Sequence, residues 1–190
     1  MPKELKALIK QEETIGIYFH IPFCISKCPY CDFNSIAVSP IPEKEYTQAL
    51  IEEIDYCMKY LLKRSEKMEV ASIFFGGGTP SLFSPAGITK CIEKVLSFFS
   101  PGPDMEVTLE VNPKTADEKK LGELYEGGVN RLSIGVQSFQ DRFLKTLGRA
   151  HDSCDAVRVY EDARSVGSTN ISFDLFFGIP HQSLMIGKGI

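Results

Sequence analysis

Five short apolar runs, rich in β-branched and aromatic residues, recur along this chain of 190 residues and constrain its fold more than any other feature. Stretches with helical periodicity lie between these runs, so strands and helices alternate. The expected strands cover residues 15–21, 70–75, 105–111, 131–136 and 171–177, and the expected helices cover 42–62, 85–99, 115–125, 140–147 and 154–166. This order predicts βαβ units in an α/β fold, with a parallel sheet that right-handed crossovers curl in one direction.

Unusual residues stand at the point where each expected strand ends. A cysteine-rich loop follows the first strand, a glycine turn at 76–79 follows the second, Glu110 lies near the end of the third, Gln137 follows the fourth, and Asp174 lies in the fifth. Glu110 and Asp174 are acidic residues inside apolar strands, where a buried carboxylate needs partners. Because parallel sheets bind their ligands at the carboxyl ends of the strands, we expect a ligand site at this end.

The loop after the first strand carries three cysteines, Cys24, Cys28 and Cys31, in the spacing C-x3-C-x2-C. Three thiolates on one loop suit an iron–sulfur cluster that keeps one iron open for a small molecule. A structural zinc site would want a fourth protein ligand, for which Cys57, Cys91 or His20 are the alternatives. His20 lies in a strand, where it is better placed to brace the loop than to bind metal.

The glycine turn, Gly-Gly-Gly-Thr-Pro at 76–80, directly follows a strand. Glycines there let a ligand approach the backbone, although an ordinary tight turn has the same composition. The turn lacks the Gly-Lys-Ser/Thr of a P-loop and the G-x-G-x-x-G of a dinucleotide fingerprint.

Composition narrows the class of protein. The net charge is −4 without a basic block, which argues against nucleic acid or an anionic membrane as the main partner. No apolar run approaches the ~20 residues that span a bilayer. The first residues carry neither a signal-peptide core nor the arginines of a transit peptide, so we expect a reducing cytoplasm. In that compartment three of the six cysteines are read as ligands, and Cys57, Cys91 and Cys154 as buried thiols.

In their longer forms these motifs resemble the radical S-adenosylmethionine (SAM) proteins. The strings are Tyr-Phe-His-Ile-Pro-Phe-Cys at 18–24, Phe-Gly-Gly-Gly-Thr-Pro-Ser at 75–81, Leu-Glu-Val-Asn-Pro at 109–113, Arg-Leu-Ser-Ile-Gly-Val-Gln-Ser-Phe at 131–139 and Leu-Gly-Arg-Ala-His at 147–151. Over residues 15–182 the chain resembles the oxygen-independent coproporphyrinogen III dehydrogenase family, with its heme-chaperone (HemW-like) branch. The resemblance implies a parallel (β/α)6 partial TIM barrel, of which about five βα units are present here.

The resemblance also implies the cofactors. Cys24, Cys28 and Cys31 would bind a [4Fe-4S] cluster whose open iron takes the amino and carboxylate groups of SAM. Reduction by an electron donor would cleave SAM to methionine and a 5′-deoxyadenosyl radical. The residues that match family positions around SAM are Tyr18, Tyr30, Gly77, Gly78, Thr79, Glu110, Gln137, Arg149 and Asp174.

The resemblance leaves open which SAM group each polar residue meets. Tyr30 matches an aromatic position beside the adenine, and the glycine turn matches backbone at the methionyl part. A carboxylate can accept from ribose hydroxyls or an ammonium, and an arginine can pair with the SAM carboxylate. Arg149 taken alone is also typical of a solvated charge at a helix end. No catalytic residue is assigned.

Phe33 decides between the branches of the family. The dehydrogenases usually carry a further cysteine two residues after the third, and here that position is Phe33. This favours a heme chaperone, which binds heme and delivers it to hemoproteins such as respiratory proteins. The alternative is an oxygen-independent coproporphyrinogen III oxidase that performs radical oxidative decarboxylation of a porphyrinogen, so whether the chain is an enzyme stays open.

The expected domain organisation has three parts. Residues 1–14 form a helical lead, residues 15–184 an incomplete radical SAM core, and residues 185–190 a divergent tail. The family's sixth barrel strand and C-terminal domain are absent from this sequence, so an inactive truncated isoform or fragment is a second alternative. The last strand would then leave an open, apolar edge.

Overall fold

A five-stranded parallel sheet forms the centre of the molecule. The computed structural model describes residues 14–61 and 68–183. The sheet has the order β1-β4-β5-β6-β7, and every neighbouring pair is parallel. Its strands are β1 (Thr14–Ile21), β4 (Glu69–Gly77), β5 (Ser100–Val111), β6 (Arg131–Gln137) and β7 (Asn170–Leu175). The predicted α/β fold with a parallel sheet is confirmed.

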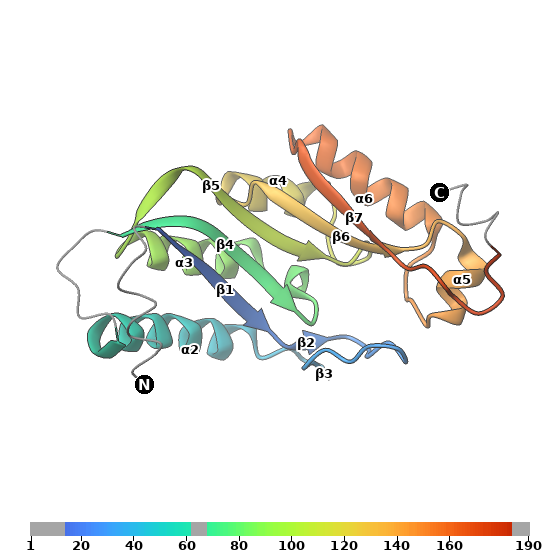
Figure 1. Ribbon diagram of the computed structural model, residues 1–190, viewed down its shortest axis with the longest axis horizontal. Coiled ribbons are helices and arrows are strands. Elements are labelled where there is room, and N and C mark those ends of the chain that lie inside the picture. Colours follow the sequence, from blue (N-terminus) through green and yellow to red (C-terminus); the bar gives the residue numbers. More distant parts are fainter. Residues whose placement is uncertain (1–13, 62–67, 184–190) are drawn as a thin grey trace.

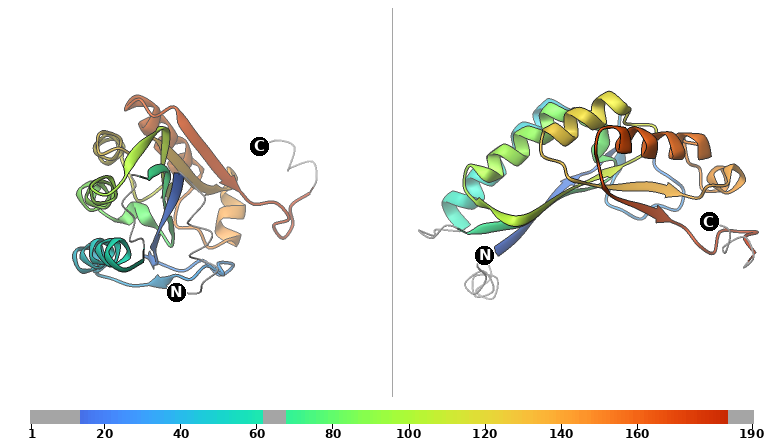
Figure 2. Two further views of the ribbon diagram at one scale, coloured as in Figure 1. Left: turned by 60° about the vertical axis from the view of Figure 1, so that its left-hand side comes forward. Right: turned by 90° about the horizontal axis from the view of Figure 1, so that it is seen from above.

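The helices cover one face of the curved sheet, as the view from above in Figure 2 shows. They are α2 (Glu43–Tyr56), α3 (Pro85–Leu96), α4 (Glu118–Glu126), α5 (Asp141–Thr146) and α6 (Ser153–Ser165), with a π-helical turn η1 (Cys57–Leu61) and a 3-10 turn η2 (Pro80–Leu82). One covered face and one open face on a bent parallel sheet are the geometry of a partial barrel.

Strand alternation explains which face is covered. In β5, Val107, Leu109 and Val111 are almost fully buried in the core, whereas Glu106 and Glu110, which alternate with them, are more accessible; Thr108, on the same face as the two glutamates, is buried. Successive side chains of a strand point to opposite faces, so the apolar set packs against the helices and the acidic set lines the open face. The open face is therefore polar, which suits a ligand and not a second apolar layer.

Most element boundaries differ from the predictions by a few residues, for local reasons. The strand predicted at 105–111 begins at Ser100, because Ser100 and Pro101 pair with Glu69 and Val70 of β4. The helix predicted at 115–125 begins after Asp117, whose side chain accepts the Lys120 N–H at 2.9 Å and caps the helix. Gly76 and Gly77 were predicted in a turn but are the last residues of β4.

Three predicted segments extend beyond the described residues. The helical lead at 1–14 lies outside them except for Thr14, which is the first residue of β1. Leu62, at the end of the helix predicted at 42–62, and the tail at 185–190 also lie outside. The division into these domains stays a prediction.

A short parallel pair, β2 (Phe23–Cys24) with β3 (Ile36–Ala37), was not predicted. The Ile36 N–H donates to Pro22 O at 2.8 Å, and the Val38 N–H donates to Cys24 O at 3.1 Å. These bonds close the cysteine loop at its base. In Figure 1 the strand arrowheads point toward the end of the molecule where β2, β3 and α5 lie.

Backbone hydrogen bonds also tie this loop to the end of β4. The Gly78 N–H donates to Ile21 O at 2.8 Å, and the Thr79 N–H donates to Phe23 O at 2.9 Å. Gly77 has a φ of +116°, which glycine adopts readily. A Cβ on Gly78 would stand 2.7 Å from Phe23 O and 2.8 Å from the Pro22 carbonyl carbon. Glycine is therefore required where the two segments meet.

The outer edge of β7 is unpaired within the described part of the chain. Phe173, Leu175 and Phe176 near it are each more than a third exposed, and Phe177 is 91% exposed. The predicted apolar open edge is present in the structure.

Gly78→Ala is expected to lower the free energy of unfolding by about 1–3 kcal/mol, the usual cost of overpacking. The added methyl would meet backbone atoms, which cannot move without disturbing the loop. Gly122→Ala in α4 is the matched control, because a Cβ there makes only an ordinary contact with Val166 at 3.5 Å. The control should gain about 0.5–1 kcal/mol from helix propensity. Urea unfolding of the full chain measures both, and equal stabilities of the two variants would contradict the prediction.

Candidate functional site

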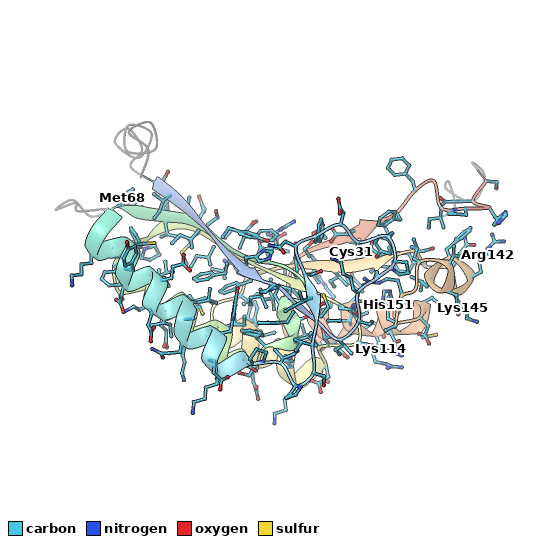
Figure 3. All side chains as sticks on the ribbon, turned by 90° about the horizontal axis from the view of Figure 1, so that it is seen from below. Cys31, Met68, Lys114, Arg142, Lys145 and His151 are labelled. Carbon is cyan, nitrogen blue, oxygen red and sulfur yellow. The ribbon has the colours of Figure 1, made fainter. Side chains whose placement is uncertain are left out.

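The twelve residues proposed from the sequence come from every strand of the main sheet and from two loops. Tyr18 lies on β1, Glu110 on β5 and Asp174 on β7, whereas Gln137 ends β6. Gly77, Gly78 and Thr79 stand at the end of β4. Cys24 ends β2, the loop to β3 holds Cys28, Tyr30 and Cys31, and Arg149 lies between α5 and α6. In Figure 3 the labelled Cys31 lies at the opposite end of the sheet from Met68.

The three loop cysteines are free thiols held at different depths. Cys24 is 9% exposed, and Cys28 and Cys31 are half-buried. The Thr79 hydroxyl lies 3.5 Å from Cys24 Sγ, so the glycine turn reaches the first thiol directly. The Cys31 N–H donates to Cys28 O at 3.0 Å and makes a tight turn between the second and third cysteines.

The arrangement of the cysteines bears on which metal group they fit. Within residues 14–61 and 68–183, no group of three His, Cys, Asp or Glu side chains converges closely enough to hold a single metal ion. A zinc ion needs its ligands around one point. In a cubane each thiolate binds a different iron, so the sulfurs surround a larger group and stand farther apart. Three thiols on one loop remain the donor set that an iron–sulfur cluster with one open iron takes.

Arg149 connects the cysteine loop to the sheet. Its Nη1 lies 3.5 Å from Cys28 Sγ and 3.5 Å from the Tyr30 hydroxyl, and its Nη2 donates to Gly135 O at 2.8 Å. The solvated role considered for Arg149 is thus wrong: its side chain is half-buried and its Nε is fully shielded without a partner. A guanidinium in this position brings positive charge to the cysteine loop.

Tyr30 forms an apolar wall of the same region. Its ring contacts Phe176 edge-on at 4.7 Å between centroids and packs against a cluster of Phe143, Leu147 and Ile179. Burial raises the pKa of Tyr30 to about 12, against the lowering effect of the Arg149 charge. The phenol is neutral, which suits contact with an uncharged aromatic ligand group.

The glycine turn presents carbonyls, because its N–H groups are already used. Gly78 donates to Ile21 O at the end of β1, Thr79 donates to Phe23 O in β2, and the Gly77 N–H donates to Glu110 Oε2 at 3.1 Å. The remaining backbone acceptors and the Glu110 carboxylate suit a ligand that donates hydrogen bonds, such as an ammonium group. Burial raises the pKa of Glu110, and the nearby Asp174 charge adds to this rise; the Gly77 hydrogen bond and His20 oppose it.

Tyr18 and His20 form a short chain on β1. His20 Nε2 lies 2.8 Å from Asn34 O, which only accepts, so Nε2 carries the proton. Nδ1 then accepts from the Tyr18 hydroxyl at 3.4 Å. The prediction that His20 braces the cysteine loop is confirmed, since Asn34 belongs to that loop. Tyr18 itself is 57% exposed and stacks on Phe74.

Asp174 and Gln137 complete the open face. Both Asp174 carboxylate oxygens accept the Ser133 hydroxyl, at 3.2 and 3.1 Å. Gln137 has a φ of +66°, an uncommon value for a residue other than glycine, and its carbonyl accepts the Phe176 N–H at 2.9 Å. Within the described residues neither side chain hydrogen-bonds to another of the twelve candidates. Backbone strain, such as the positive φ of Gln137, clusters at functional sites.

Sequence reasoning missed His151, which carried no signal on its own. His151 is 3% exposed, and its Nε2 donates to Val136 O at 3.0 Å. Burial and the Arg149 charge lower the pKa of His151, so the imidazole is neutral. Its Nδ1 is buried without a partner, as is Arg149 Nε. Figure 3 shows His151 at the same end of the molecule as Cys31.

The cysteines outside the loop only partly match the prediction of buried thiols. Cys91 is 2% exposed, and burial raises the pKa of its thiol to about 11. Cys57 is half-buried. Cys154 is exposed, so the prediction was wrong there, because it lies in the first turn of α6 beyond the buried stripe of that helix.

Residues 18–185 match the family model of the radical SAM superfamily. The chain belongs to this superfamily. Its relatives include proteins named heme chaperone HemW from Escherichia coli and Bacillus subtilis. The first is 41% identical over 171 residues, and the second is 40% identical over 168 residues. These matches cover 90% and 88% of the chain but only 44% and 43% of the relatives.

A third relative carries a different name. The mouse protein called radical S-adenosyl methionine domain-containing protein 1, mitochondrial, is 40% identical over 169 residues, which is 89% of this chain and 37% of that protein. The radical SAM chain therefore spans less than half the length of these curated relatives. In the described ranges, 14–61 and 68–183, no helix is long and apolar enough to cross a bilayer.

Solved structures share the fold. Coproporphyrinogen III oxidase (HemN) from Escherichia coli, described as a radical SAM enzyme, has a TM-score of 0.86 at 28% identity and covers 100% of this chain and 43% of that one. The archaeal Methanocaldococcus infernus Elp3, at a TM-score of 0.54 and 16% identity, shares the fold alone. Membership in the superfamily implies a [4Fe-4S] cluster and SAM, and the free cysteines beside a carbonyl-presenting turn fit both.

Glu110→Gln is expected to raise the free energy of unfolding at about pH 8, since glutamine removes a buried charge and keeps an oxygen for the Gly77 N–H. A carboxyl with a raised folded pKa is favourable in its protonated form. Wild-type stability therefore falls as pH rises through that pKa, and the advantage of glutamine is lost below it. Urea unfolding between about pH 8 and about pH 4 measures this. An advantage that grows toward low pH would contradict the assignment.

Proposed function

We propose that this chain is the radical SAM core of a heme chaperone, with a [4Fe-4S] cluster on Cys24, Cys28 and Cys31. The observation that carries the branch is Phe33, which stands where the dehydrogenases have a further thiol and is 65% exposed. The identity of about 40% to proteins named heme chaperone supports the same branch.

The proposed roles follow from what each group can offer. The cluster and SAM, when bound, supply one-electron and radical chemistry. The carbonyls of Gly77 and Gly78, with Glu110, which accepts the Gly77 N–H, would accept hydrogen bonds from the SAM ammonium. Arg149 places positive charge near the cluster loop, Thr79 steadies Cys24, and Tyr30 gives an apolar surface for the adenine. Tyr18, Gln137 and Asp174 line the open face and would hold the rest of SAM.

Partners and location follow from the same proposal. The chain would take electrons from a donor and heme as cargo, and pass heme to respiratory proteins. A reducing compartment keeps the cluster thiols available, which fits the cytoplasm, or the mitochondrion named for one relative.

The second candidate is the porphyrinogen oxidase. The structure that favours it is HemN, which matches this chain along its whole length. Incubation of the loaded, reduced chain with SAM and coproporphyrinogen III tests it. Hemin titration, read at the Soret band, tests the chaperone. Saturable hemin binding without a decarboxylated product supports the chaperone, and a decarboxylated product would overturn it. A chain that takes up no iron and does not unfold cooperatively would point to the inactive fragment.

Cys28→Ala is expected to abolish cluster binding, since each of the three thiolates holds one iron. Cys154→Ala is the control, because that thiol is exposed on α6 and outside the loop. Anaerobic reconstitution with iron and sulfide should load the wild type and the control with about four iron atoms, and Cys28→Ala with few or none. EPR or Mössbauer spectra of the wild type should change on adding SAM. An unchanged iron content in Cys28→Ala would refute the ligand assignment.

A further inference from the structure

Arg149 is a charged group from a distant part of the chain that contacts the cysteine loop. Its Nη1 stands 3.5 Å from Cys28 Sγ, although the two residues are separated by 121 positions in the chain. Among the described residues Arg149 forms no ion pair with a carboxylate. A half-buried guanidinium interacts more strongly with a nearby anion than one in bulk water. Nη1 faces the Cys28 sulfur and the Tyr30 hydroxyl, and the sulfur would become a thiolate on binding iron.

The position of the guanidinium is fixed from several sides. Nη2 donates to Gly135 O at 2.8 Å, and a Cβ on Gly135 would stand 3.5 Å from the same nitrogen. The backbone N–H of Arg149 donates to Leu144 O at 2.9 Å. Gly148, at a φ of +66°, lies so close to the loop that a Cβ would stand 2.8 Å from Pro29 Cδ. The loop that carries Arg149 is thus packed directly on the loop that carries Cys28.

Fixed charges and hydrogen bonds to the sulfurs set the potential of an iron–sulfur cluster. Adding one electron makes the cluster and its thiolates more negative. A cation held at one sulfur therefore stabilises the reduced form more than the oxidised form, and its half-buried setting strengthens the effect. The step is [4Fe-4S]2+ plus one electron giving [4Fe-4S]+, with the electron from a low-potential one-electron reductant such as reduced viologen. No bond or proton changes place.

We propose that Arg149 is a positioning residue that raises the reduction potential of the cluster through a charged hydrogen bond to the Cys28 sulfur. This role rests on the proposed cluster site and is separate from any contact of Arg149 with SAM. It acts in the absence of SAM, which makes it measurable apart from cofactor binding.

The test is a redox titration of the reconstituted full chain without SAM, read by the EPR signal of the reduced cluster. At the wild-type midpoint, Arg149→Gln should shift the ratio of oxidised to reduced cluster at least tenfold toward the oxidised form. For a one-electron couple, a tenfold shift corresponds to a midpoint potential about 59 mV lower. Arg149→Lys keeps the charge but loses the planar fork of the guanidinium. Its midpoint potential should fall between those of the wild type and Arg149→Gln.

Arg142→Gln is the matched control. Arg142 lies on α5, hydrogen-bonds to Gln140 and contacts the Phe143 ring, and Figure 3 shows it at the same end of the molecule. Arg142→Gln removes one charge without removing a contact to Cys28. The ratio of oxidised to reduced cluster at the wild-type midpoint should therefore stay within twofold of wild type.

The outcomes separate this inference from the proposed function. A wild type that binds no cluster refutes the proposed function. A loaded Arg149→Gln with the wild-type midpoint overturns the tuning role, and so does an equal shift in Arg142→Gln. Loss of the cluster from both Arg149 variants, with the wild type loaded, also overturns it, because Arg149 would then hold the loop together. A lowered midpoint in Arg149→Gln alone, with loading unchanged, supports it.

Discussion

The pair of backbone hydrogen bonds between the end of β4 and the strand that enters the cysteine loop is the constraint on which the site depends. Gly78 donates to Ile21 O and Thr79 to Phe23 O, and glycine is required at the first position because a Cβ would meet backbone. These bonds place the turn beside Cys24 and use up the N–H groups of the turn. Both the location of the first thiol and the carbonyl character of the neighbouring surface follow from this one contact.

Charge is divided across the site in a way that fits a zwitterionic cofactor. Arg149 brings positive charge to the cysteine side, whereas Glu110 and Asp174 bring negative charge to the open face of the sheet. Keeping Glu110 buried beside Asp174 works against folding, since burial and the second carboxylate raise its pKa. A glutamine at position 110 would keep the hydrogen bond without the buried charge. A carboxylate that lowers stability there is typical of a position retained for binding.

The sequence predicted what depends on local pattern and failed where distant segments meet. Short apolar runs rich in β-branched and aromatic residues located all five strands of the sheet. Asp117 and Asp152 shifted helix starts by capping that the pattern did not weigh. The β2–β3 pair was missed because two-residue strands carry no periodicity. The contact of Arg149 with Cys28 spans 121 positions, so only folding reveals it. The bracing role of His20 was predictable, because His20 lies in a strand and the three cysteines lie in the loop that follows it.

The open edge of the sheet is coupled to the site and is not a remote surface. Phe176 follows β7, donates its N–H to the strained Gln137 and packs its ring on Tyr30. Tyr30 in turn shares Arg149 Nη1 with Cys28. The end of β7 is therefore linked to the cysteine loop through the contacts of Phe176 with Tyr30 and of Tyr30 with Arg149.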